Sequence, residues 1–265
     1  MIEVVVFGIC GKMGKSISKE LIKEDDVKII GGFDKKNAGE DLGIILNIGE
    51  TGSKIYNSYK EIERIKPDLI IDFTKADIAL KTINWAIDKG INIIVGTTGI
   101  SKESLFEIKK RTLKSNSKVF IAPNFSIGAA IMMKISKLVA KYFDNCEIIE
   151  LHHDGKIDAP SGTSISTAEQ ISKEVVFNNN RLKDNEVETV TGSRGSFSNG
   201  IHIHSVRLPG LLAHQNVIFG TKGQTLSIRH DSIDRSSFYP GVIHAIRSIN
   251  NLPNYTYGLD SLINT

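Results

Sequence analysis

One stretch in the middle of the chain, Glu150–Thr163, gathers residue types that could do chemistry on an anionic substrate. It reads Glu-Leu-His-His-Asp-Gly-Lys-Ile-Asp-Ala-Pro-Ser-Gly-Thr, so two imidazoles and a lysine come just before a helix-start signal. An imidazole can supply a proton at neutral pH because its unperturbed pKa is about 6.5. The free backbone N–H groups at the start of a helix bind carboxylate or phosphate. Together they predict a pocket for a small anion with an acid at hand.

The flanking residues predict which elements position this stretch. Cys146–Leu151 is short and rich in apolar residues, which is typical of a strand. A segment with apolar residues at helical spacing follows the stretch, with Ser161 or Thr163 as a natural N-cap. We therefore expect a strand end to deliver His152 and His153, and a loop and a helix N-terminus to close the site.

Each member of this set also has an ordinary explanation. His152 and His153 can be plain residues at a strand edge, and Lys156 can be a solvated loop charge. Adjacent strand residues point to opposite faces, so the two histidines are not expected to share one role. The combination of residues, rather than any single one, is the reason to predict a site.

Composition narrows the class of protein. The chain has 265 residues, of which 40% are hydrophobic and 24% charged, as in a soluble protein of one or two domains. A net charge of +3 with scattered lysines favours anionic ligands and does not argue for nucleic acid. Two cysteines are too few for a disulfide framework and fit a reducing compartment. With no apolar run long enough for a membrane span, we expect a cytoplasmic protein.

An amino-terminal glycine motif predicts a dinucleotide-binding fold. Val4–Phe7 is a candidate buried strand, and it leads into Gly8-Ile-Cys-Gly-Lys-Met-Gly14 and then a helical pattern. This GxxGxxG spacing differs from the usual GxGxxG fingerprint and is weak by itself. However, a second strand, Val27–Phe33, ends at Asp34, where an acid can hold the adenosine ribose hydroxyls. A glycine-rich connection in another kind of α/β protein is the alternative.

The residues after that second strand bear on cofactor choice. Asp34 favours NAD(H), whereas a neighbouring cation can pair with the 2′-phosphate of NADP(H). Lys35 is the nearer candidate and Lys36 follows it, although paired lysines in a loop are often simply solvated. Both signals together suggest that NADH and NADPH can each serve.

Strand and helix patterns alternate up to residue 125. We expect strands at 68–73, 91–95 and 118–122 and helices at 59–65, 76–87 and 101–113. Such alternation implies a doubly wound parallel sheet, in which ligands lie beyond the carboxyl ends of the strands. Thr97, Thr98 and Asn124 follow strands and are plausible contacts to the ribose and nicotinamide end of the cofactor. Residues 38–55 show no regular pattern.

The pattern changes in the second half of the chain. A helix is expected at 128–143, a polar surface loop or lid at 177–200, strands at 201–208, 215–220 and 224–230, and a last helix at 236–249. Strands without intervening helices predict an α+β domain with a mixed or antiparallel sheet. We therefore divide the chain into a dinucleotide-binding domain, 1–125 plus 238–265, and a substrate-binding and oligomerisation domain, 126–237.

His202 and His204 stand two apart on one expected strand and would share a face, as half of a metal site does. No cysteine or convincing third ligand accompanies them, so we predict no metal.

Seven motifs resemble the 4-hydroxy-tetrahydrodipicolinate reductase family, also called dihydrodipicolinate reductase. They run in order over essentially the whole chain: Gly8–Gly14, Asp72–Thr74, Gly96–Gly99, Ala122–Ser126, Glu150–Thr163, His204–Gly210 and Ala213–Gln215. The block from His152 to Thr163 is the most specific of them.

The resemblance implies reduction of 4-hydroxy-tetrahydrodipicolinate to tetrahydrodipicolinate with NADH or NADPH, in the diaminopimelate route of lysine biosynthesis. It implies His152 as the acid/base and Lys156 as the other proton donor, with His153, Gly162 and Thr163 binding the carboxylates of a dicarboxylate substrate. The cofactor-binding residues it implies are Gly8, Ile9, Cys10, Gly11, Lys12, Met13, Asp34, Lys35, Gly96, Thr97, Thr98, Ala122, Pro123, Asn124 and Phe125.

The resemblance further implies a homotetramer assembled through the second sheet. One departure from the family is Asp154, which stands where a basic residue is common and would weaken attraction of anions to the pocket mouth.

Two other functions remain in competition. Another Rossmann dehydrogenase of amino-acid metabolism, acting on aspartate or a semialdehyde, accounts for the first half of the chain but gives the histidine block no purpose. A nucleotide-sensing regulator would bind NAD(H) yet need neither an acid nor a lid. A hydride-transfer assay with a panel of keto and imino acids separates the three.

Overall fold

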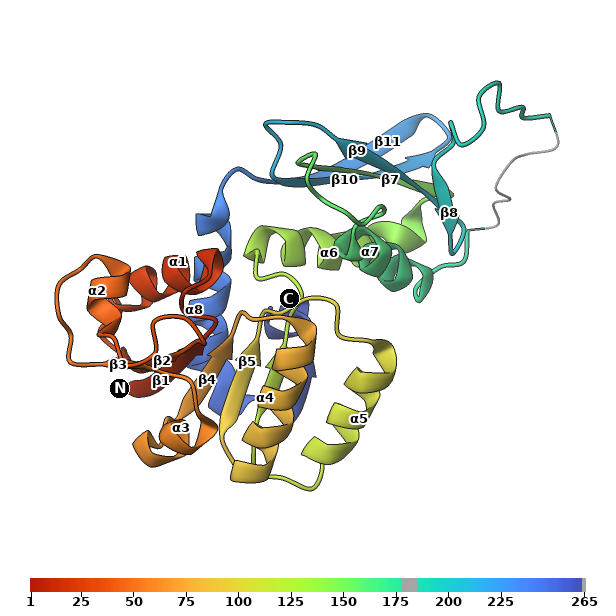
Figure 1. The fold of residues 1–265 in the computed structure, drawn as a ribbon. Coiled ribbons are helices and arrows are strands. Elements are labelled where there is room, and N and C mark those ends of the chain that lie inside the picture. Colours follow the sequence, from red (N-terminus) through yellow and green to blue (C-terminus); the bar gives the residue numbers. More distant parts are fainter. Residues whose placement is uncertain (178–184, 264–265) are drawn as a thin grey trace. The chain divides into compact units, whose positions relative to one another are not determined.

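The computed structural model describes residues 1–177 and 185–263, which form two compact units. One unit contains Met1–Phe125 together with the segment that begins at Phe238, and the other contains Ser126–Ser237 (Figure 1).

The first unit is built on a seven-stranded sheet in which every strand pair is parallel. Its strands are β1 (Ile2–Phe7), β2 (Val27–Phe33), β3 (Lys54–Tyr56), β4 (Leu69–Asp72), β5 (Asn92–Val95), β6 (Val119–Ile121) and β12 (Tyr255–Tyr257). They are ordered β12-β6-β5-β4-β1-β2-β3, so the direction of winding reverses between β1 and β4. Ligands of doubly wound sheets bind at this switch point. The predicted Rossmann-type fold is confirmed.

Helices cover both faces of this sheet, which explains why its central strands are apolar throughout. The helices are α1 (Lys12–Leu21), α2 (Leu42–Leu46), α3 (Tyr59–Ile65), α4 (Ala76–Lys89), α5 (Lys102–Thr112) and α8 (Tyr239–Ser248). Side chains of α3, α4 and α5 share one buried cluster with β1, β4, β5 and β6. Val4–Phe7 and Ile70 are fully buried. Gly90, in the left-handed region at φ +70°, ends α4.

Three short elements were not predicted. Residues 38–55, which show no sequence pattern, contain α2 and most of β3, and Tyr255–Tyr257 adds β12 beside β6. Asp41 caps α2 by accepting a hydrogen bond from the Gly43 backbone N–H at 2.7 Å. Elements of three to five residues carry too little periodicity to be recognised, and contacts with neighbouring elements stabilise them.

The second unit contains a mixed five-stranded sheet, ordered β11-β10-β7-β9-β8. Its elements are α6 (Ile127–Val139), β7 (Asn145–His152), α7 (Gly162–Ser172), β8 (Ser196–Ser198), β9 (Ile201–Arg207), β10 (Ala213–Thr221) and β11 (Gln224–Ser232). β7 and β9 are parallel and the other pairs are antiparallel, which confirms the predicted mixed sheet. Met132 and Met133 of α6 and Ile171 of α7 pack into one core with Ile148 and Phe219 of the sheet.

The polar stretch 177–200 was predicted to be a loop or lid. Residues 178–184 of it lie outside the described residues. At its far end the prediction was wrong, because Ser196–Ser198 pairs antiparallel with β9 as the edge strand β8. In the described residues, no helix has both the length and the apolar character needed to cross a membrane.

Candidate active site

Glu150 and His152 occupy the end of β7 and, two residues apart on a strand, point to the same face. The Glu150 side chain is fully buried, and its Oε2 atom is hydrogen-bonded to Nδ1 of His152. The His152 side chain is 14% exposed to solvent. The strand therefore delivers one of the two predicted histidines onto a buried carboxylate, whereas His153 follows the strand and is exposed.

Arg207 supplies the second partner of Glu150. β7 and β9 are parallel, and their register sets Arg207 beside His152. Its Nη1 and Nη2 atoms donate to Oε2 and Oε1 of Glu150 at 3.0 and 2.9 Å, which is a bidentate ion pair. We did not predict Glu150 or Arg207 as functional residues. The signal that could have found them is a charge at an inward position of an apolar strand, because a buried charge must be paired.

These contacts decide the charge of Glu150. Burial alone would raise the pKa of its carboxyl, but hydrogen bonds from His152, Arg207 and Ser205 outweigh burial and lower the pKa to about 2. Glu150 is therefore ionised at neutral pH and acts as a hydrogen-bond acceptor only.

The loop after β7 is tied to the same arginine. Nη2 of Arg207 donates to the Asp158 carbonyl oxygen at 2.6 Å. Lys156 Nζ donates to Oδ1 of Asp158 at 2.6 Å, and this hydrogen bond, against weak burial, lowers the pKa of the Asp158 carboxyl. The Lys156 side chain is 21% exposed.

The N-terminus of α7 completes this edge of the second unit. Ser161, one of the two predicted candidates, is the N-cap, and its hydroxyl accepts a hydrogen bond from the Ser164 backbone N–H at 3.2 Å. Gly162 and Thr163 form the first turn, where backbone N–H groups lack partners within the helix. A methyl group added at Gly162 would meet nothing within 4 Å, so this turn borders open space. The helix start can hold a carboxylate.

In the first unit, the glycine motif allows the backbone to approach closely at the end of β1. A Cβ atom at Gly14 would lie 2.2 Å from the Gly8 carbonyl oxygen, and one at Gly8 would lie 2.7 Å from the Phe73 carbonyl oxygen. Gly11 is the N-cap residue of α1 and has no side chain that could accept a hydrogen bond. The first backbone N–H groups of α1 therefore have no side-chain cap. A glycine-lined turn that opens onto a bare helix N-terminus fits the pyrophosphate of a dinucleotide.

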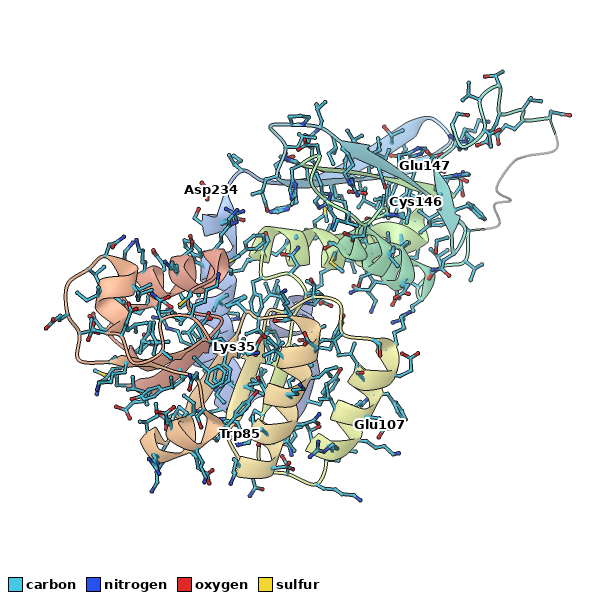
Figure 2. All side chains as sticks on the ribbon, viewed as in Figure 1. Lys35, Trp85, Glu107, Cys146, Glu147 and Asp234 are labelled. Carbon is cyan, nitrogen blue, oxygen red and sulfur yellow. The ribbon has the colours of Figure 1, made fainter. Side chains whose placement is uncertain are left out.

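Asp34 lies where the ribose of such a cofactor is expected. Its Oδ2 accepts a hydrogen bond from the Cys10 N–H at 3.1 Å, and its Oδ1 accepts one from the Lys36 N–H at 3.0 Å. The carboxylate thus holds the loops after β1 and β2 together, and its remaining lone pairs are suited to ribose hydroxyls. Lys35 is exposed next to it, and Figure 2 labels its position in this unit.

The predicted contacts near the nicotinamide end follow β5 and β6. Thr97 is buried, and its hydroxyl donates to Oδ1 of Asp72 at 2.9 Å, an oxygen that also accepts from the Thr74 hydroxyl at 2.7 Å. Burial raises the pKa of the Asp72 carboxyl against these hydrogen bonds. The Thr97 hydroxyl is therefore already hydrogen-bonded within the protein. The other residues of this predicted set differ in exposure: Thr98 and Pro123 are exposed, Gly96 and Asn124 are half-buried, and Ala122 and Phe125 are buried.

Both histidines of β9 also have protein partners. His202 Nδ1 donates to the Arg194 carbonyl oxygen at 2.7 Å, and Nε2 of His204 lies 2.8 Å from Oε2 of Glu147. Within residues 1–177 and 185–263, no group of three or more His, Cys, Asp or Glu side chains is arranged to hold a metal ion.

Comparison with known families covers both units. The family described as "Dihydrodipicolinate reductase, N-terminus" matches residues 2–125, and "Dihydrodipicolinate reductase, C-terminus" matches residues 128–263. The chain belongs to the dihydrodipicolinate reductase family. A 4-hydroxy-tetrahydrodipicolinate reductase of Dictyoglomus turgidum is 45% identical over 265 residues, covering 100% of this chain and 98% of the relative. One from Carboxydothermus hydrogenoformans is 43% identical, covering 99% of this chain and all of the relative.

Solved structures agree with this assignment. A dipicolinate-bound dihydrodipicolinate reductase from Paenisporosarcina sp. TG-14 is 36% identical and superposes with a TM-score of 0.85, covering 99% of this chain and 100% of that one. An aspartate dehydrogenase from Thermotoga maritima, representing the rival class of dehydrogenases, is 10% identical with a TM-score of 0.53, covering 94% and 96%. At that identity only the fold is shared, whereas the reductase family accounts for both halves of the chain.

The buried carboxylate of this family member makes its stability depend on pH. The pKa of Glu150 falls from an ordinary value of 4.5 to about 2 on folding, which corresponds to about 3 kcal/mol of stability at neutral pH. Because the folded pKa is the lower one, this stability is present above pH of about 4.5 and is lost as the pH falls towards about 2. Urea unfolding followed by circular dichroism at a series of pH values measures it.

A matched pair of variants isolates the contribution of Glu150. Glu150→Gln should flatten the acid-side loss of unfolding free energy, while Glu107→Gln, at a side chain that is 62% exposed, should leave it unchanged. Equal acid sensitivity of wild type and Glu150→Gln would contradict the assignment.

Proposed function

We propose that this chain reduces 4-hydroxy-tetrahydrodipicolinate to tetrahydrodipicolinate with NADH or NADPH, in the diaminopimelate route of lysine biosynthesis. The observation that carries the proposal is a histidine held on a buried, ionised carboxylate next to a lysine-bearing loop and a helix N-terminus. Curated relatives of that name, 40–45% identical over 98–100% of this chain, support the same reaction. The dipicolinate in the related solved structure is a planar dicarboxylate of the same general shape.

The site residues divide the work of the reaction. Overall, the substrate loses water and gains one hydride and one proton, and the bound nicotinamide cofactor supplies the hydride. Hydride arriving at a conjugated imine leaves negative charge that must be protonated, and we assign the donation of that proton to His152. General acid help of this kind is worth about 10²–10⁴-fold. Lys156 is the other proton donor, and its ammonium also attracts the dicarboxylate.

The substrate carboxylates need cationic and N–H partners. Gly162 and Thr163 offer the unpaired N–H groups of the first turn of α7, and His153 is exposed at the adjoining loop. Asp154, also exposed in that loop, lowers the positive potential at the mouth. We assign the carboxylates to these three residues and the substrate domain to residues 126–237.

We assign the cofactor to the domain formed by residues 1–125 and 238–265. The glycine motif would hold the pyrophosphate, Asp34 the adenosine ribose and Lys35 a 2′-phosphate. The residues assigned to the cofactor are Gly8, Ile9, Cys10, Gly11, Lys12, Met13, Asp34, Lys35, Gly96, Thr97, Thr98, Ala122, Pro123, Asn124 and Phe125. For Thr97 the contact is through the backbone, because its hydroxyl is bound to Asp72.

Turnover tests the proposed reaction. Oxidation of NADH and of NADPH is followed by absorbance, with substrate freshly made from pyruvate and aspartate semialdehyde by the preceding enzyme. Wild type should turn over, while His152→Gln and Lys156→Ala should each lose about 10²-fold or more in kcat and keep their affinity for NADH. A well-folded wild type that oxidises neither cofactor with this substrate would refute the reductase assignment.

Cofactor choice tests the assignment of Lys35. A charge-assisted hydrogen bond to the 2′-phosphate is worth about 1.5–3 kcal/mol, so Lys35→Ala should raise KM for NADPH by about tenfold or more and leave KM for NADH unchanged. Lys36→Ala is the matched control, since it removes the same charge one residue further along. Equal effects of the two variants on NADPH would mean that general charge, and not contact by Lys35, is involved.

We further propose a cytoplasmic homotetramer assembled through the second unit. The sheet face opposite α6 and α7 carries Ile149, Leu151 and Ile218, which remain partly exposed and would be covered by another copy. Both cysteines are free, as a reducing compartment requires. Sedimentation velocity should give the mass of four chains, and Ile218→Asp should shift it towards smaller species. A monomer at micromolar concentration would contradict this assembly.

A further inference from the structure

Within the part of the chain that the structure describes, the Glu150–Arg207 ion pair contacts the proposed acid, His152, and the loop that follows β7. The Glu150 side chain is fully buried and the Arg207 side chain is 19% exposed. Resting on the proposed function, we propose that Glu150, locked by Arg207, is a positioning residue. It fixes the tautomer and orientation of His152 and stabilises the protonated imidazole from which the proton is delivered.

The tautomer follows from the charge of the carboxylate. An ionised Glu150 can only accept hydrogen bonds, so Nδ1 of His152 must carry the hydrogen that joins them. In the neutral imidazole the free lone pair is then on Nε2, and in the imidazolium the transferable proton is on Nε2. The proton is thereby directed away from the buried carboxylate. An opposite tautomer would point the lone pair of Nδ1 at a negative charge.

Arg207 keeps the carboxylate itself from rotating. Its two terminal nitrogens bind both oxygens of Glu150, and the planar guanidinium fixes the plane of the carboxylate in a way that an ammonium cannot. The same guanidinium donates to the Asp158 carbonyl oxygen at 2.6 Å. One arginine thus sets the position of the acid His152 and of the loop that carries Lys156.

The second unit contains a solvated counterpart of this triplet. On the other face of β7, Glu147 contacts His204 at 2.8 Å and Arg194 at 2.6 Å, and Figure 2 labels Glu147 on this strand. The Glu147 side chain is 37% exposed and that of Arg194 is 34% exposed, and one guanidinium nitrogen of Arg194 donates to Glu147. Glu147 therefore provides a control with the same partner types but without full burial or a bidentate lock.

The pH dependence of turnover reports on the charges around His152. These charges are Glu150 on its own strand, Arg207 on β9, and Asp158 and Lys156 in the following loop. The β10 residue paired with His152, Ala213, is uncharged. Of these, Glu150 is the group hydrogen-bonded to the imidazole. Activity that needs the imidazolium falls as the pH rises, so losing the negative charge that is hydrogen-bonded to the ring should move this fall to lower pH.

A double-mutant cycle tests whether Glu150 acts through His152. We expect Glu150→Gln to lower kcat by about 100-fold with little change in KM for NADH, and to add little once His152→Gln is already present. Arg207→Lys should fall between wild type and Glu150→Gln, and Glu147→Gln should keep wild-type kcat. Multiplicative losses in the double variant, or equal losses in Glu147→Gln and Glu150→Gln, would overturn the proposal.

A measurement on the unaltered protein covers the case in which Glu150→Gln does not fold. The ¹H–¹⁵N correlations of the imidazole rings identify the His152 tautomer, which should carry its hydrogen on Nδ1. A hydrogen on Nε2 alone would overturn the positioning role. If wild type does not turn over the substrate, the proposed function fails, whereas an active wild type with an unshifted pH profile in Glu150→Gln refutes only this inference.

Discussion

A carboxylate that has lost all contact with water must find donors for both oxygens, and this requirement organises the second unit. Glu150 meets it with Arg207 from a strand 57 residues away in sequence and with His152 from its own strand. Removing one partner of such a pair is costly because it leaves an uncompensated buried charge. The pairing therefore holds β7 and β9 in register, and the imidazole of His152 faces a fixed negative charge.

The same arrangement connects stability to chemistry. The hydrogen bonds that lower the pKa of Glu150 to about 2 also orient His152, and Arg207 extends the network to the loop that bears Lys156. The His152 side chain and the loop that bears Lys156 are thus positioned by an interaction whose loss would destabilise the fold. Preorganised groups of this kind do not need to rearrange when charge develops on the substrate.

The first unit depends on a different constraint, which is the close approach of one backbone segment to another. Gly8 and Gly14 permit contacts that any side chain would block, and Asp34 ties two neighbouring loops together through their N–H groups. At the next strand end, Asp72 also ties two loops together, because it accepts hydrogen bonds from the Thr74 N–H and from the Thr97 hydroxyl. In both places a carboxylate shapes the edge of the parallel sheet where ligands bind.

The sequence by itself determined the fold class, the order of nearly all long elements and the family. Apolar periodicity, glycine spacing and the block from His152 to Thr163 are local signals, and they are readable without knowledge of distant contacts. It also narrowed the N-cap of α7 to Ser161 or Thr163, because a cap acts on residues next to it in the chain, and the structure shows that the cap is Ser161.

Only the tertiary structure decided which of the adjacent histidines is held by the protein and by what. The register of β7 and β9 sets Arg207 beside His152, and no local pattern encodes a pairing across that separation. It also decided that the Thr97 hydroxyl is bound to Asp72, and that Ser196–Ser198 and Tyr255–Tyr257 are edge strands. Short strands form because a neighbouring strand offers hydrogen bonds, so their signal lies in the partner and not in their own residues.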